Sequence, residues 1–313
     1  MPLAVIMQAL LPVMLLIILG FALRKSGAVP AEHWRGVELL LYWLLFPAML
    51  IVTLARSEVS FAALSGFAMA LFAMVLVLTI TAWALRRPLR RHFGMRGPTF
   101  TSFFQTSTRW HGFVAFAIVE RLYGFDGVAI IAIAFAAMIP WLNVANVTVL
   151  ALYAGKTRPT PALVLKALFS NPFLWGIAIG LAWKLSPLPA AGIALTTLEL
   201  LGRGALGLSL LALGAGLSWQ ALKNARREVL LTIIMKLIFA PVLALTLGRL
   251  FGVSGEPYVI MVVAAAVPTA VAGYVLARKM GGDAEFYAAA ATAQVVVSFL
   301  TMPLFIALAM WLA

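Results

Sequence analysis

A run of polar and charged residues interrupts one of the apolar stretches of this chain. It spans residues 105–111, which read Gln-Thr-Ser-Thr-Arg-Trp-His, and Gly112 follows directly. The guanidinium of Arg109 stays charged and matches the two oxygens of a carboxylate. Thr108 offers a hydroxyl, and His111 changes its charge near neutral pH, so it is a candidate proton carrier. These residue types favour an anion-binding site. The alternatives are a structural cation paired with helix carbonyls for Arg109, and an ordinary hydrogen bond for His111.

A second interruption lies later in the chain. Residues 267–270 read Val-Pro-Thr-Ala, and Gly273 follows. Pro268 has no backbone N–H and breaks a helix, while Thr269 adds a hydroxyl. A helix that resumes after a break presents free N–H groups and the positive end of its dipole, which suits an anion. Matched breaks in two halves of a membrane chain indicate a binding site. Ordinary kinked helices with packed Ser and Thr are the alternative.

Four further polar residues fall inside apolar stretches. Lys236 is a second cation, which could bind a dicarboxylate, substitute for a bound ion, or neutralise a helix dipole. Asn143, Asn146 and Gln294 are neutral and could hold the broken backbone, the substrate or an ion. We expect Asn143 to contribute to substrate binding, and we keep Asn146 and Gln294 as candidates for ion coupling. Interhelical hydrogen bonding is the alternative for all three amides.

Composition places these residues in a membrane. Of the 313 residues, 64% are apolar and 11% are charged, and the mean hydropathy is +1.06. A soluble domain of this length cannot bury so much apolar surface, and a disordered chain would be far more polar. Cysteine is absent and the three histidines lack metal-ligand spacing, so we expect no disulfide and no metal site. The net charge of +13 fits cationic loops beside an anionic leaflet rather than nucleic acid.

Apolar runs of about 20 residues are long enough to cross the bilayer as helices. Because the runs are continuous rather than alternating, they predict helices and not a barrel. The first run is too long for a cleaved signal peptide. The sequence predicts ten transmembrane helices, at about residues 3–23, 37–55, 60–85, 99–120, 127–154, 167–184, 200–218, 228–249, 257–277 and 285–312.

The distribution of cations predicts the orientation. Sixteen of the 23 Lys and Arg residues fall in the odd-numbered connections, five fall in the even-numbered connections and termini, and Arg109 and Lys236 lie inside the runs. The positive-inside rule therefore places the odd connections in the cytoplasm and both termini outside, on the periplasmic side of a cell inner membrane. Glu199 and Arg203 form an i, i+4 pair that we expect to be structural.

The chain divides into two halves of five runs each, at residues 1–155 and 156–313. Because five is odd, the second half must enter the membrane with the opposite orientation, as in inverted-repeat transporters. The fourth run of each half carries a break followed by similar residues, Gly-Phe-Val-Ala from position 112 and Gly-Tyr-Val-Leu from position 273.

Several short motifs, taken in order, resemble the auxin efflux carrier family, in the bacterial branch that includes malonate-type permeases. The resemblance extends over nearly the whole chain. Its motifs are Leu-Phe-Pro-Ala at 45–48, Thr-Arg-Trp-His-Gly-Phe-Val-Ala at 108–115, Ile-Pro-Trp-Leu-Asn-Val at 139–144, Asn-Pro at 171–172, Val-Pro-Thr-Ala at 267–270, Val-Leu-Ala at 275–277 and Gly-Gly-Asp at 281–283.

This resemblance implies a specific architecture. Residues 1–55 and 167–218 would form a scaffold that also makes a homodimer. Residues 60–154 and 228–312 would form a transport domain that moves in an elevator-like manner, with the fourth and ninth helices unwound and crossing at the substrate. The chain departs from the family at His111, where many bacterial relatives have Asn, so a ligand role of that amide does not carry over directly.

The sequence thus predicts an all-α secondary transporter for a small organic anion, a mono- or dicarboxylate. One alternative is sodium-coupled import of a bulkier amphipathic anion, as in bile-acid symporters. A passive channel and a membrane-embedded enzyme are the other classes, but the predicted helices lack acidic residues in their cores and show no catalytic set. We expect no cofactor, no nucleic-acid partner and a coupling ion, H⁺ or Na⁺, that the sequence leaves open.

Overall fold

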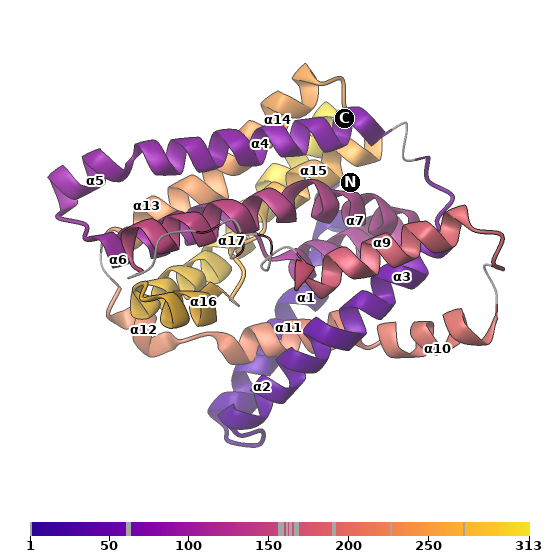
Figure 1. Ribbon diagram of the computed structural model, residues 1–313, viewed down its shortest axis with the longest axis horizontal. Coiled ribbons are helices and arrows are strands. Elements are labelled where there is room, and N and C mark those ends of the chain that lie inside the picture. The colour runs from indigo at the N-terminus through magenta and orange to yellow at the C-terminus, as the bar shows by residue number, and fades with distance from the viewer. Residues whose placement is uncertain are drawn as a thin grey trace. The chain divides into compact units, whose positions relative to one another are not determined.

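The computed structural model describes residues 2–60, 64–155, 160, 162, 165, 169–189, 192–225, 227–271 and 273–313. Within these residues every regular element is a helix (Figure 1), so the predicted all-α class is confirmed. Most of the connection at 155–166, and the start of the run predicted at 167–184, lie outside the described residues.

The chain forms two compact units. Unit 1 comprises Met1–Leu64, Phe113–Ala136 and Phe169–Gly216. Besides the first part of the long helix α7 (Gly112–Tyr153), its helices are α1 (Pro2–Lys25), α2 (Ala31–Leu40), η1 (Leu41–Leu45), α3 (Phe46–Arg56), α9 (Pro172–Leu185), α10 (Ile193–Gly202) and α11 (Ala205–Gly216).

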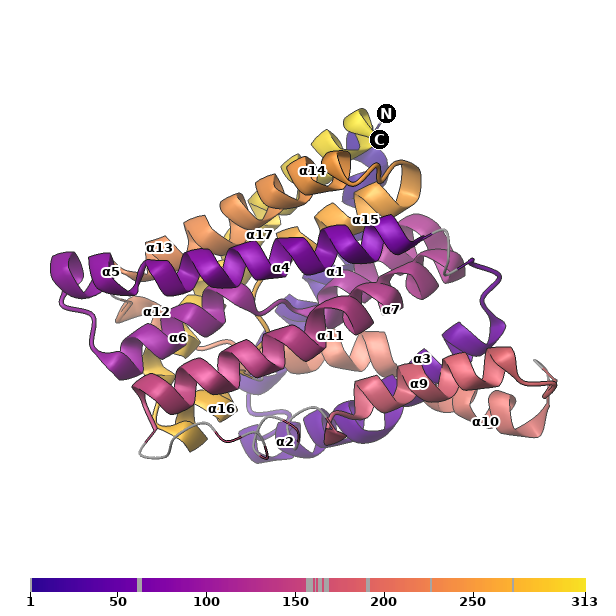
Figure 2. The ribbon, with the colours of Figure 1, turned by 45° about the horizontal axis from the view of Figure 1, so that its top comes forward.

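Glycines allow the helices of unit 1 to approach closely. A Cβ on Gly214 of α11 would lie 1.8 Å from the carbonyl oxygen of Ile17 in α1, and a Cβ on Gly20 would lie 2.0 Å from that of Leu211. Helix α9 runs alongside α3 (Figures 1 and 2), where Gly176 packs onto the backbone of Pro47. Small residues are used in this way between membrane helices because they bring the backbones into contact.

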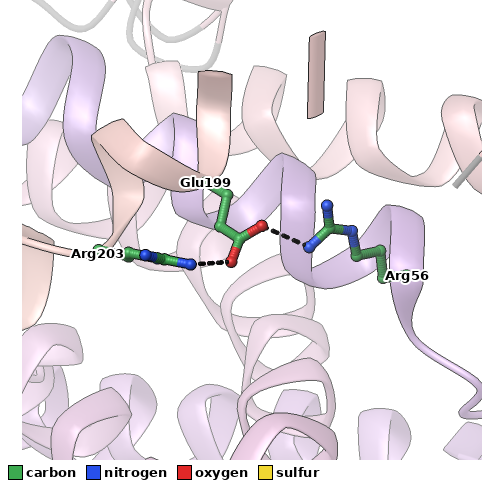
Figure 3. Close-up of polar contacts among 3 residues, drawn as sticks. All are labelled: Arg56, Glu199 and Arg203. Carbon is green, nitrogen blue, oxygen red and sulfur yellow. Dashed lines mark hydrogen bonds and ion pairs between the residues drawn. The ribbon is translucent and has the colours of Figure 1, made fainter. Parts of the chain in front are cut away.

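An ion-pair network ties α3 to α10 in unit 1. Glu199 accepts from Arg203 at 2.8 Å, which confirms the predicted i, i+4 pair, and from Arg56 at 2.7 Å (Figure 3). The second partner comes from 143 positions away in the chain. The side chain of Glu199 is 30% exposed, so water screens these pairs and they contribute little to stability.

Unit 2 comprises Ser65–Gly112, Ala137–Leu168 and Leu217–Ala313. Its helices, besides the last part of α7, are α4 (Ser65–Ala84), α5 (Arg86–Phe93), α6 (Gly97–Thr108), α12 (Trp219–Lys223), α13 (Val229–Ile233), η3 (Ile234–Phe239), α14 (Ala240–Leu250), α15 (Gly255–Ala266), α16 (Gly273–Met280) and α17 (Ala284–Leu312). Helices α4 and α14 pack against each other (Figure 2). Unit 2 contains both predicted breaks.

Seven helical stretches in the described residues are long and apolar enough to cross a membrane. One of them, residues 97–153, has 57 residues, which at 1.5 Å each would extend about 85 Å, far more than one bilayer. It is broken before Gly112 and again at Gly124, whose φ and ψ are 62° and −148°. Helices α9 and α15 are apolar but have only 14 and 12 residues. Several candidate spanning helices are thus present in the described residues, and the total of ten stays a prediction.

The two packing units do not have the same bounds as the predicted scaffold and transport domain. The sequence assigns residues 60–154 to the transport domain, whereas Phe113–Ala136 lies in unit 1. Which helices move during transport stays a prediction.

Candidate functional site

The first break lies between α6 and α7. Helix α6 ends at Thr108, Arg109 is extended with φ −68° and ψ 154°, and α7 begins at Gly112 after His111. The hydroxyl of Thr108 donates to Phe104 O at 2.8 Å and to Asn146 Oδ1 at 3.3 Å. Two of the predicted residues, Thr108 and Asn146, are therefore brought together, and both are buried.

The second break lies between α15 and α16. Helix α15 ends at Ala266, Val267 is extended, and α16 begins at Gly273. The backbone N–H of Thr269 donates to Gln294 Oε1 at 2.9 Å. The polar side chain of α17 thus takes the place of the helical hydrogen bond that the break removes.

A backbone hydrogen bond joins the two breaks directly. His111 N donates to Pro268 O at 2.8 Å. Gln294 adds a second link, because its Nε2 donates to Thr106 O in α6 at 3.0 Å and to Thr232 O in α13 at 3.2 Å. Two segments about 157 positions apart in the chain are therefore held against each other inside unit 2. We call residues 109–111 and 267–271, with these contacts, the crossover.

Lys236 lies beside the crossover in the π-helical turn η3. Its side chain is buried, and Nζ donates to Ala265 O at 2.6 Å. A cation at the C-terminal end of a helix is stabilised by the helix dipole. This contact corresponds to the dipole-neutralising role among the predicted alternatives, and a contact between Lys236 and substrate stays a prediction.

The charges at the crossover are positive. Arg109 is half-buried in the first break, and Lys236 is buried beside the second. The buried polar residues of the described chain include Lys236 and His111 but no aspartate or glutamate. The two cations are Arg109 and Lys236, and the described residues place no buried carboxylate beside them. An anion bound near both would lower the electrostatic energy.

The remaining two predicted residues, Gly112 and Asn143, both lie in α7. Gly112 is the first residue of α7, where the free N–H groups of that helix begin. Asn143 is half-buried, one helical turn from Asn146, and within the described residues no hydrogen bond joins it to the crossover. Its role in substrate binding stays a prediction.

Sequence reasoning missed Tyr287. Its fully buried hydroxyl donates to Ala270 O at 2.5 Å and lies 3.3 Å from Thr269 Oγ1. A Cβ on Gly273 would lie 2.1 Å from that hydroxyl, so a glycine at the start of α16 makes room for it. The only signal in the sequence is a single tyrosine in the Ala-rich start of the last helix.

Gln105 in α6 is another buried amide near the first break, but it differs from Gln294 in its hydrogen bonds. Its side chain is fully buried, and neither amide atom has a hydrogen-bond partner among the described residues. It lies one turn before Arg109, whose backbone N–H donates to Gln105 O at 2.8 Å.

Comparison with known proteins adds independent findings. Residues 156–306 match the family described as "Membrane transport protein". Over 305 residues the chain is also 23% identical to a protein of Methanothermobacter thermautotrophicus named an uncharacterized transporter, with 95% of this chain and 96% of that protein aligned. The resemblance predicted from the motifs is confirmed. Residues 156–306, just under half of the chain, match this family, and the apolar helices indicate a multi-pass membrane protein.

Proposed function

We propose that this protein is a secondary transporter that moves a small organic anion, a mono- or dicarboxylate, across the cell inner membrane. The observation that carries the proposal is the crossover, where two broken helices meet through the hydrogen bond from His111 N to Pro268 O. Broken helices inside a membrane protein are tolerated where they line a cavity or pack in protein, and they are typical of transporter binding sites.

The sign of the substrate charge follows from the groups around the crossover. Arg109 lies in the first break and Lys236 at the end of α15. The carbonyls at the two helix ends are partly occupied, because Lys236 holds Ala265 O and Gln294 holds Thr106 O. The N-terminal starts of α7 and α16 then remain as positive dipole ends for a carboxylate, and the guanidinium supplies a bidentate partner.

Movement of the substrate requires alternating access. We propose an elevator-like cycle in which a transport domain containing the crossover moves against a dimeric scaffold, with both termini on the periplasmic side. Coupling to H⁺ would use His111, and coupling to Na⁺ would draw on oxygen atoms such as those of Asn146 and Gln294. The family resemblance supports the elevator and the dimer, and the distribution of cations supports the orientation.

A thermal-unfolding screen of the purified protein tests the anion site. Malonate, acetate and larger carboxylates are added with and without sodium, and stabilisation identifies a bound anion through mass action. We expect Arg109→Ala to abolish this stabilisation while the unliganded protein stays folded. Arg278→Ala, which removes an exposed cation of unit 2, is the matched control and should keep it.

Two outcomes would change the proposal. Equal stabilisation of the Arg109→Ala variant by carboxylates removes Arg109 from the site. Stabilisation only by bulky amphipathic anions, and only with sodium, favours the bile-acid-symporter-like alternative over a small carboxylate.

A further inference from the structure

Helix α5 carries positive charge on one face and packing residues on the other. Arg87, Arg90 and Arg91 occupy positions i, i+3 and i+4, so they share a face, and all three are exposed. Leu89 on the opposite side is buried, with 4% of its surface exposed. We call Arg87, Arg90 and Arg91 the arginine face.

The neighbouring Arg86 behaves differently. Its guanidinium lies over the ring of Tyr153, 4.1 Å from the centroid, and 5.8 Å from that of Phe100. This arginine is therefore an anchor that attaches α5 to the rest of unit 2 through cation–π contacts. The arginines of one short helix divide into an internal anchor and an outward face.

Few acidic groups are available to the arginine face. Residues 86–96 contain five arginines and a histidine but no Asp or Glu, and no ion pair to the face is found within the described residues. Two further groups lie near the end of α5: Arg227, whose guanidinium is 5.3 Å from the ring centroid of Phe93, and Glu228, which lines a hollow with Arg96. The cations outnumber this acid.

The arginine face also has a defined depth. Helix α4 is a predominantly apolar helix of 20 residues, about 30 Å long at 1.5 Å each, which matches the hydrocarbon thickness of a bilayer. Helix α5 begins two residues after α4 ends. From this length we expect the arginine face at the boundary where lipid phosphates are found, and a basic amphipathic helix at that depth is typical of contact with anionic lipid.

We propose that the arginine face is a binding site for the phosphate groups of anionic phospholipids. Guanidinium groups bind phosphate oxygens through charge-assisted and bidentate hydrogen bonds. Three of them on one helical face, with the packing side anchored by Leu89 and Arg86, form a surface that distinguishes anionic from zwitterionic headgroups.

The turn that follows α5 connects the proposed lipid site to the crossover through α6. A turn that contains Gly94, with φ 63°, leads from α5 to the start of α6 at Gly97. A Cβ on Gly97 would lie 2.2 Å from Tyr153 O, and Tyr153 is also the residue that Arg86 covers. Lipid bound to α5 thus contacts the element that continues into α6, whose other end is the first break.

Direct lipid binding tests the proposal. The purified full-length protein in an uncharged detergent is titrated with fluorescently labelled phosphatidylglycerol, and in parallel with labelled phosphatidylcholine. We expect tighter binding of phosphatidylglycerol. In the variant with Arg87→Gln, Arg90→Gln and Arg91→Gln its affinity should fall roughly 100-fold, on the order of fivefold for each cation removed.

The matched control removes the same charge elsewhere. Lys25→Gln, Arg278→Gln and Lys279→Gln together replace three exposed cations, and this variant should keep the affinity within about threefold, because net charge alone does not make the site. If the triple variant of the arginine face does not fold, Arg90→Gln alone should weaken binding about fivefold.

Three results would overturn the proposal. They are equal loss of binding in both triple variants, equal affinity of the unchanged protein for the two lipids, and displacement of phosphatidylglycerol by millimolar glycerol phosphate, which would indicate a site for a soluble phosphate compound. Because the readout is lipid binding, these results are independent of whether an organic anion is transported.

Discussion

Replacement of Gln294 should lower the stability of the crossover more than replacement of any other of its residues. Its amide makes three hydrogen bonds, to Thr269 N, Thr106 O and Thr232 O. They connect the second break to the ends of α6 and α13, and the side chain is fully buried. Gln294→Leu keeps the approximate volume but leaves three backbone groups without a partner.

The contacts set the size of the effect. Interhelical hydrogen bonds in membranes average about 0.6 kcal/mol, so three give about 2 kcal/mol. A buried group left without a partner costs about 1–3 kcal/mol, and the backbone N–H of Thr269 is such a group in this variant. We therefore expect a loss of about 2–5 kcal/mol, which corresponds to a fall of about 3–8 °C in the unfolding temperature.

Gln105 provides a control of the same chemistry. Gln105→Leu is the same substitution at an equally buried position, but no hydrogen bond of the amide is lost within the described residues. Because the cost of burying the amide disappears, its unfolding temperature should be unchanged or higher. Both variants are measured by thermal unfolding in the same detergent. An unfolding temperature within about 1 °C for Gln294→Leu, or an equal fall for both variants, would refute the assignment of Gln294 as the link between the breaks.

Three further outcomes are expected. Gly214→Ala should destabilise the protein by about 1–3 kcal/mol in thermal unfolding, because its Cβ would lie 1.8 Å from a backbone oxygen of α1; Gly207→Ala on the same helix meets nothing within 4 Å and should not. If His111 carries the coupled proton, His111→Asn should flatten the pH dependence of vesicle uptake near neutrality, and an unaltered profile excludes that role. Cysteines placed at Arg90 and Asn224 should react with impermeant reagents from the cytoplasmic side alone, and labelling from outside would contradict the predicted orientation.

The breaks were predictable because their causes are local. A proline without an N–H, a run of polar residues and glycines after each run identify positions at which a helix ends. The structure ends α6 at Thr108 and α15 at Ala266, close to these signals. The number of crossings was harder to predict, because α9 and α15 are short and the stretch 97–153 is continuous in hydropathy despite its break at Gly124.

The partners of each polar side chain were not predictable from the pattern. The pattern left Gln294 with three possible roles, to hold the broken backbone, the substrate or an ion; its amide holds the crossover backbone, and ion coupling stays a prediction. Lys236 had several possible roles, and the fold places it on Ala265 O. Tyr287 carried no clear signal, because a buried hydroxyl becomes informative only when the carbonyl that it meets is known.

The amino-acid sequence alone determines that this chain lies in a membrane and that two of its helices are interrupted, since composition and backbone chemistry act within a few residues of each position. Only the tertiary structure decides that the interruptions meet. The contacts that join them connect residues 25 to 188 positions apart, and such pairs depend on how the helices of unit 2 pack. That packing gathers a guanidinium, a lysine and two helix starts around one crossover, and places the arginine face of α5 at the end of an apolar helix.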